Sequence, residues 1–182
     1  MKQLTLILFL IFISCKNESK TQTENGIDKS VSEMWNNFTK LNPEFKNEAI
    51  PESDFFHNNR EDANRLAELT LKGKKKASSG LYSLYKHYNV DLPKVGTKQI
   101  ITDFDGNAQA IIENKSVDIV PFDKISDEYA EMDMGTDIEP LEKWKKAHWD
   151  FFESVLEESG EKPNEKMLVV CVRFETIWPE KH

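Results

Sequence analysis

A chain of 182 residues with 38% hydrophobic side chains is long enough for one domain with a buried core. Its 24 basic and 32 acidic side chains give a formal net charge of −8 at pH 7. That balance excludes a general DNA-coating protein, which needs a broad basic face to displace counterions from the phosphates. A local basic pocket remains compatible with it.

The first 14 residues have the pattern of a signal peptide. An apolar run from Leu4 to Ile13 follows Lys2; it is too short to span a hydrocarbon core of roughly 30 Å and matches the apolar part of such a peptide. The Ser14-Cys15 pair at its end resembles a bacterial lipoprotein signal. The resemblance implies a lipid-anchored protein of the cell envelope, attached to a membrane through Cys15. The alternative is an ordinary secretory signal whose cleavage releases a secreted protein.

Residues 15–27 are polar and contain no aromatic side chain, which predicts a flexible tether before a folded domain at 28–182. Apolar residues at helical spacing predict a first helix over 31–41, ending before Pro43. A second helix is expected over 61–72, with Gly73 as its C-terminal stop. The lysines at 72 and 74–76 then lie at a helix C-terminus, where the helix dipole favours cations.

The periodicity changes after residue 96. We expect a strand over 97–104, a hairpin turn at Asp105-Gly106-Asn107 and a long or bent strand over 108–122. A short helix near 126–132, an amphipathic helix from 141 to Gly160 and a closing strand over 167–178 follow, the last apolar on both faces and therefore central in a sheet. This order indicates an α+β fold with a small, mostly antiparallel sheet or barrel.

Six segments carry a resemblance to a known family, in matching order and spacing. They read ANRLAELTLKGKKKAS, LPKVG, TDFDGNAQAIIE, DIVPFDKI, LEKWKKAHWDFF and MLVVCVRF. From about Trp35 to Trp178 the chain thereby resembles the ASCH domains, a PUA-like family linked to RNA, and a bacterial subgroup within it. The resemblance implies a small mixed, mostly antiparallel β-barrel with flanking helices.

The family's signature loop is Gly-x-Lys-x-x-Thr/Ser, and residues 73–78 read Gly-Lys-Lys-Lys-Ala-Ser. Some small ASCH members hydrolyse N4-acetylcytidine, and the resemblance implies a lysine, a hydroxyl and a downstream carboxylate as the catalytic set. These positions fall on Lys75, Ser78 and Asp133, with Glu131 as the alternative carboxylate. Serine replaces the more usual threonine, and aspartate replaces a glutamate that reaches one methylene further.

The same residue types also suit a binding pocket. A lysine acts as a base only when neutral, whereas a nearby carboxylate favours its charged form. Lys74, Lys75 and Lys76 with a hydroxyl can hold a phosphate, and Glu113 can accept from an exocyclic amine unless it is only a structural partner of a lysine. Tyr129 or Trp144 can stack on a base, although aromatic residues at helical spacing more often belong to the core. His148 lies at the same helical spacing, and we expect it to be a core residue.

The sequence is compatible with three functions. The first is a binding module for a nucleotide, a modified nucleoside or an RNA fragment. The second is an amidohydrolase that removes an N4-acyl group from cytidine-type substrates, and the third is a non-catalytic envelope interaction protein. A lipoprotein signal disfavours RNA as the natural ligand. No zinc-binding spacing is present, no cofactor is expected, and Cys171 is expected to be a core residue.

Overall fold

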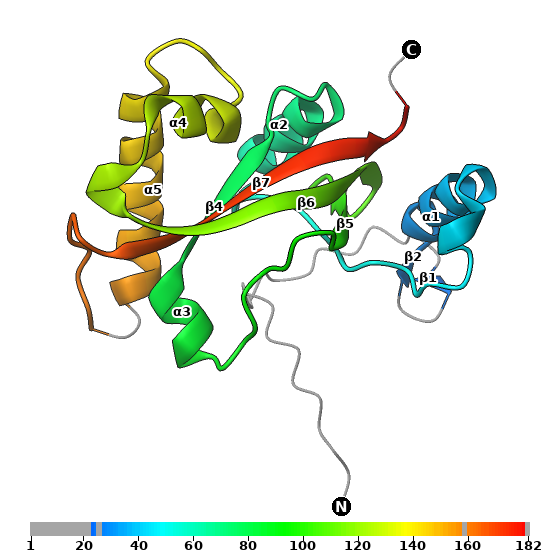
Figure 1. Ribbon diagram of the computed structural model, residues 1–182, viewed down its shortest axis with the longest axis horizontal. Coiled ribbons are helices and arrows are strands. Elements are labelled where there is room, and N and C mark those ends of the chain that lie inside the picture. The colour runs from blue at the N-terminus through cyan, green and yellow to red at the C-terminus, as the bar shows by residue number, and fades with distance from the viewer. Residues whose placement is uncertain (1–22, 25–26, 158–159, 181–182) are drawn as a thin grey trace, which may run out of the picture.

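The computed structural model describes residues 23–24, 27–157 and 160–180, and a five-stranded sheet is its centre (Figure 1). The strand order is β3-β5-β6-β7-β4. The bounds are Ser53–Asp54 for β3, Lys98–Thr102 for β5, Ala108–Pro121 for β6, Leu168–Trp178 for β7 and Ala77–Leu81 for β4. The β3–β5 pair is parallel and the other pairs are antiparallel. The chain is therefore a mixed α/β protein whose sheet is open, with β3 and β4 as its edges, and closure into a barrel stays a prediction.

The N-terminal part forms a small unit at one end of the sheet. A two-residue ribbon pairs β1 (Thr23–Glu24) with β2 (Ile27–Asp28), and α1 (Lys29–Leu41) follows directly. The Asp28 side chain caps α1 by accepting from the Ser30 amide, and a 3-10 turn, η1 (Pro43–Phe45), follows the helix. The predicted signal peptide and Cys15 lie outside the described residues.

Helices cover the sheet in two further groups, α2 and the α4–α5 pair (Figure 1). The first, α2 (Arg60–Leu71), packs Ala67 against a cluster shared by β5, β6 and β7. The helices α4 (Asp127–Met134) and α5 (Pro140–Glu157) pack over β4 and β7, with Trp144 and Phe152 fully buried between them. The connections contain α3 (Tyr82–His87) and η2 (Phe122–Lys124).

The sequence predicted a long or bent strand over 108–122, and β6 is long. Its pairing with β7 shifts register between Ile111 and Ile112 and again between Asn114 and Ser116, and such irregularities bend a strand and increase its twist. The strand β7 lies between β6 and β4, and its residues Val169 to Val172 are buried. Its apolar residues on both faces thus fit a central position, as expected.

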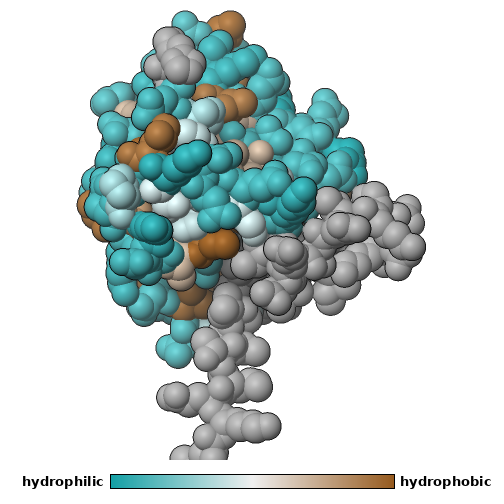
Figure 2. Space-filling view, turned by 90° about the vertical axis from the view of Figure 1, so that its right-hand side faces the viewer, coloured by the Kyte–Doolittle hydropathy of each residue, from teal (hydrophilic) through white to brown (hydrophobic). Residues whose placement is uncertain are grey.

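Figure 2 shows a mainly hydrophilic face on which apolar residues appear as separate spots. The large hydrophobic residues that are exposed are distributed along the chain: Leu41, Tyr88, Val90, Val95, Ile119, Ile138 and Leu168. Within the described residues, no helix has the length and apolar character needed to cross a membrane.

Candidate functional site

A turn after α2 places the side chain of Lys75 in the protein interior. Gly73 has φ 63°, a left-handed conformation that glycine adopts without strain, and it ends the helix. The amides of Lys74 and Lys75 then both donate to the Leu69 carbonyl. The lysines at 72, 74 and 76 are exposed, whereas Lys75 is only 4% exposed. The helix-end explanation therefore fits three of the four lysines and leaves Lys75 to be explained.

The buried ammonium of Lys75 meets Asp133 of α4. Its Nζ lies 2.5 Å from Oδ1 of Asp133 and 2.8 Å from the backbone carbonyl oxygen of the same residue. Asp133 is 3% exposed, so both charges of this ion pair are removed from water. Taking two ions out of water costs several kcal/mol each, and only close geometry with further hydrogen bonds offsets that cost.

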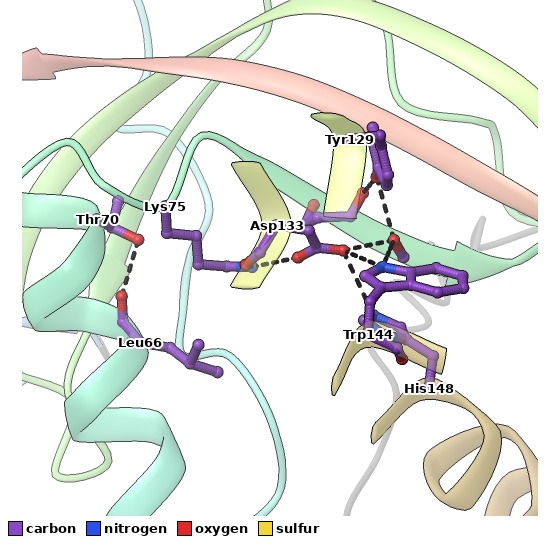
Figure 3. Close-up of polar contacts among 9 residues, drawn as sticks. Leu66, Thr70, Lys75, Tyr129, Asp133, Trp144 and His148 are labelled. Carbon is purple, nitrogen blue, oxygen red and sulfur yellow. Dashed lines mark hydrogen bonds and ion pairs between the residues drawn. The ribbon is translucent and has the colours of Figure 1, made fainter. Parts of the chain in front are cut away.

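The other carboxylate oxygen of Asp133 is the centre of the cluster (Figure 3). Oδ2 accepts from the Ser79 hydroxyl at 2.6 Å and from Trp144 Nε1 at 2.9 Å. It also lies 3.4 Å from Nε2 of His148. Behind these groups, the Tyr129 hydroxyl donates to the Ser78 carbonyl at 2.6 Å and lies 3.1 Å from the Ser79 hydroxyl. We call Lys75, Ser79, Asp133, Trp144 and His148 the polar cluster.

Burial and partners set the protonation of this cluster. Burial disfavours the charged carboxylate of Asp133, but the charge of Lys75 and the hydrogen bonds outweigh burial, and the pKa of Asp133 lies below its ordinary value. Desolvation lowers the pKa of His148 below its ordinary value, although Asp133 and the Trp144 carbonyl oppose that shift. Burial also raises the pKa of Tyr129 far above its usual range, so its hydroxyl stays protonated.

A cleft of about 820 Å³ lies beside the polar cluster, between α2 and α5. One wall consists of Met134 and Gly135, directly after Asp133. Gly135 has φ 65°, and a Cβ atom there would lie 3.3 Å from the Lys75 amide nitrogen. The cleft wall is therefore in contact with the backbone that carries Lys75. The lining also includes cations, carboxylates and rings: Arg65, Lys143, Lys146, Asp62, Asp150, His57 and Phe151.

The connection between β3 and α2 covers the lysine. The Phe56 ring centroid lies 4.7 Å from Lys75 Nζ, and the same ring stacks on Phe174 at 6.2 Å. The next residue, His57, has φ 68° and packs its ring 6.0 Å from that of Phe151. A positive φ is uncommon for a residue other than glycine. Phe56 thus occupies the position from which an aromatic ligand could approach the ammonium.

A family model described as ASCH domain matches residues 52–178, a segment that contains the polar cluster and the cleft. The chain belongs to the ASCH domain family. It is 28% identical to an ASCH domain from Lactobacillus crispatus JV V101, with a TM-score of 0.76 over 83% of this chain and 96% of that chain. It is 31% identical to protein EF3133 from Enterococcus faecalis V583, with a TM-score of 0.73 over 82% of this chain and 88% of that chain. The comparison with curated proteins gave no match.

The positions that the ASCH signature assigns are only partly brought together. Lys75 and Asp133 are in direct contact, whereas Glu131 is exposed on α4. Ser78 supplies its carbonyl to Tyr129, and the hydroxyl that contacts Asp133 belongs to Ser79. Strand alternation explains this difference, because Ala77 and Ser79 share a face of β4 that residue 78 does not.

The other predicted binding residues have different surroundings. Glu113 forms ion pairs with Lys98 at 3.4 Å and Lys115 at 2.6 Å, which is the structural pairing that the sequence left open. These lysines and their hydrogen bonds lower the pKa of Glu113, the bond from Lys115 contributing most. Tyr129 and Trp144 are buried and hydrogen-bonded, so neither ring is presented at the surface.

The remaining predictions concern Lys74 and Lys76 as ligand-binding residues and Cys171 as a core residue. Lys74 and Lys76 point away from the buried cluster, although the backbone of Lys76 bonds to Met132 and Phe174. Cys171 is a free buried thiol whose pKa burial raises to about 11. In the described part of the chain, no group of three or more histidine, cysteine or acidic side chains is placed to hold a metal ion.

Two members of the cluster were not assigned to it from the sequence. Ser79 could have been found from alternation, because Ala77 and Leu81 on either side of it belong to one buried cluster. His148 was expected in the core; it is partly buried, with 15% of its side chain exposed, and it faces a carboxylate. The contact depends on how α5 packs against α4, which local sequence does not specify.

Proposed function

We propose that this ASCH domain binds a nucleoside or nucleotide in the cleft, with the polar cluster as the polar end of the site. The observation that carries the proposal is the buried Lys75–Asp133 pair, joined to a serine hydroxyl and separated from the cleft by its Met134–Gly135 wall. Replacing a buried ion pair by apolar residues of similar volume is often neutral or stabilising. Stability alone is therefore a weak reason for such a cluster, and buried charged groups next to a cleft are typical of functional sites.

The chemistry of the cleft fits such a ligand. Phe151 lines the cleft and offers a ring for stacking, and a ligand that displaces the Phe56 ring would reach Lys75 and Ser79 as donors to the edge of a nucleobase. Arg65 and Lys143 line the same cleft and suit a phosphate group. The net charge of −8 favours a small ligand over a long nucleic acid.

Calorimetric titration tests the proposal. We expect cytidine or cytidine 5′-monophosphate to bind the wild-type protein, and Lys75→Gln to weaken binding at least tenfold because the site loses its buried cation. The matched control is Lys72→Gln, which removes an exposed lysine three residues earlier and should leave affinity unchanged. Equal affinities for the two variants would contradict a site at Lys75.

A second candidate is hydrolysis of N4-acylated cytidines, favoured by the 2.6 Å bond from the Ser79 hydroxyl to Asp133. The Ser79 oxygen would attack the acyl carbon while its proton moves to Asp133, and Asp133 would pass that proton to the N4 amine as the C–N bond breaks. A water molecule would then hydrolyse the acyl-serine ester, releasing the carboxylic acid and restoring the Ser79 hydroxyl. We expect Ser79→Ala, rather than Ser78→Ala, to abolish turnover of N4-acetylcytidine. An active wild type with an equally active Ser79→Ala variant would reject this mechanism.

The N-terminal segment supports a proposal about location. Because the apolar run ends at Ser14-Cys15, we expect a diacylated Cys15 and partition of the protein into membranes. Cys15→Ala should abolish the anchor. Mass spectrometry that finds an unmodified Cys15 in a soluble mature protein would contradict it.

A further inference from the structure

His57, in the connection between β3 and α2, lines the cleft with an aromatic ring. Its side chain is 33% exposed, and its ring lies 6.0 Å from that of Phe151, which lines the same cleft. Its φ of 68° is a conformation that glycine adopts without strain. A turn alone favours glycine at this position, and other residues held in such a conformation are concentrated at ligand-binding sites. The His57 side chain is therefore a candidate for contact with a ligand.

The N-terminal cap of α2 determines which nitrogen of the His57 ring carries the hydrogen. Asn59 caps the helix, and its Oδ1 accepts from the Asp62 amide at 2.9 Å. The other end of the Asn59 side chain, Nδ2, only donates. It lies 3.0 Å from Nδ1 of His57 and 2.9 Å from Oδ2 of Asp62. Nδ1 of His57 therefore accepts, so the ring is neutral and its hydrogen is on Nε2. Among the described residues, that N–H has no hydrogen-bond partner.

The charged side chains of the cleft leave one cation without a carboxylate. Arg65 pairs with Asp62, and Lys146 pairs with Asp150, each at 2.7 Å. Lys143 also lines the cleft, and its side chain has no ion pair with any residue that the structure describes. The lining thus carries one excess positive charge in a protein whose net charge is −8. A cleft concentrates the field of its charges, so an anionic group is favoured near Lys143.

The rings and the unpaired cation lie at different heights along α5. Lys143 precedes Phe151 by roughly two helical turns, or about 12 Å along the helix axis. His57 contacts Phe151 and so belongs to the aromatic end of the cleft. This separation is comparable with the distance from the base to the phosphate of a mononucleotide.

We propose that the cleft binds a nucleotide in one orientation, with the base beside Phe151 and hydrogen-bonded to Nε2 of His57, and the phosphate at Lys143. The inference rests on the proposed function and adds a specificity-determining residue to it, and it requires no contact with Lys75. A neutral ring with its hydrogen on Nε2 only donates there, so the base must present an oxygen or nitrogen lone pair. Cytosine has such atoms in O2 and N3, whereas its N4 amine does not fit.

The first experiment needs no ligand. Nuclear magnetic resonance spectra that correlate the ring protons of histidine with the ring nitrogens, recorded near neutral pH, should show His57 with a hydrogen on Nε2 and none on Nδ1. The exposed His87 gives an internal reference. A hydrogen on Nδ1 of His57 overturns the proposed donor.

The second experiment compares cytidine with cytidine 5′-monophosphate by calorimetric titration. His57→Phe keeps a ring beside Phe151 but removes the donor, so it should weaken both ligands about tenfold. His57→Gln retains a donor and should restore part of that loss. Lys143→Gln should weaken the nucleotide about fivefold and leave cytidine unchanged, because only the nucleotide has a phosphate. The control Lys145→Gln changes an exposed lysine of α5 outside this cleft and should leave both affinities unchanged.

The outcomes separate this inference from the proposed function. Equal affinities of wild type and His57→Phe for cytidine overturn the inference and leave the proposed function to the Lys75→Gln test. A loss of cytidine affinity in Lys143→Gln overturns the orientation. If wild type binds neither ligand, the proposed function and the inference are both rejected. Should His57→Phe not fold, His57→Asn removes the same donor and adopts a positive φ more readily.

Discussion

Removing the Lys75 ammonium should cost much stability, because it leaves a buried carboxylate without its cation. In Lys75→Met the aliphatic volume is kept, while Asp133 loses a 2.5 Å ion pair at a site where both side chains are under 5% exposed. Breaking a buried pair by removing one partner typically costs about 3–5 kcal/mol. For a domain of this size, each kcal/mol lowers the melting temperature by roughly 2–4 °C, so we expect a fall of about 6–20 °C.

Urea denaturation of three variants separates charge from packing. Lys72→Met changes an exposed lysine paired with Glu68 and should denature close to wild type. The double variant Lys75→Met/Asp133→Leu removes both charges and should recover much of the loss, because the uncompensated carboxylate is gone. The reasoning would be refuted by a Lys75→Met variant within about 1 kcal/mol of wild type, or by a double variant less stable than Lys75→Met alone.

Three further predictions concern the surroundings of the pair. Ser79→Ala should lower the free energy of unfolding by about 1–3 kcal/mol because Asp133 loses a donor, whereas Ser78→Ala should cost clearly less; equal losses in urea titrations would contradict the assignment. The pKa of His148 is lower in the folded protein than in the unfolded chain, so its contribution to the free energy of unfolding is full above the unfolded pKa of about 6.5 and is lost as the pH falls. The melting temperature of His148→Gln should therefore depend less on pH below pH 6.5 than that of wild type. An equal dependence of the two melting temperatures on pH would contradict a neutral ring. Gly135→Ala should destabilise by about 1–2 kcal/mol because alanine is strained at φ 65°, and an unchanged melting temperature would count against that backbone geometry.

Most helices and strands could be predicted from the sequence because each has a strong local pattern of apolar residues. The first helix was expected over 31–41 and occupies Lys29–Leu41, and the second was expected over 61–72 and occupies Arg60–Leu71. Apolar spacing and the Asn59 cap specify such elements locally. The short β3 strand could not be predicted in this way, because it has two residues and pairs in parallel with a strand 45 positions later in the chain.

Of the candidate site, only the residues implied by the family resemblance could be predicted from the sequence. The signature loop pointed to Lys75, and the resemblance implied a downstream carboxylate at Asp133 or Glu131; Asp133 is the one in contact with Lys75. It assigned the hydroxyl to Ser78, although Ser79 is the residue that faces Asp133, because alternation along β4 decides which side chain points inward. His148 could not be assigned from sequence, since its approach to Asp133 depends on the packing of α5 against α4.

The most direct test of the proposed site is a residue-resolved titration of the isotopically labelled protein with cytidine 5′-monophosphate. We predict saturable amide shift changes at Gly135 in the cleft wall and at Lys75 and Ser79 behind it, while Gly106 in the β5–β6 hairpin stays unchanged. The absence of any saturable change up to millimolar nucleotide, or changes confined to the hairpin, would contradict a nucleotide site at Lys75.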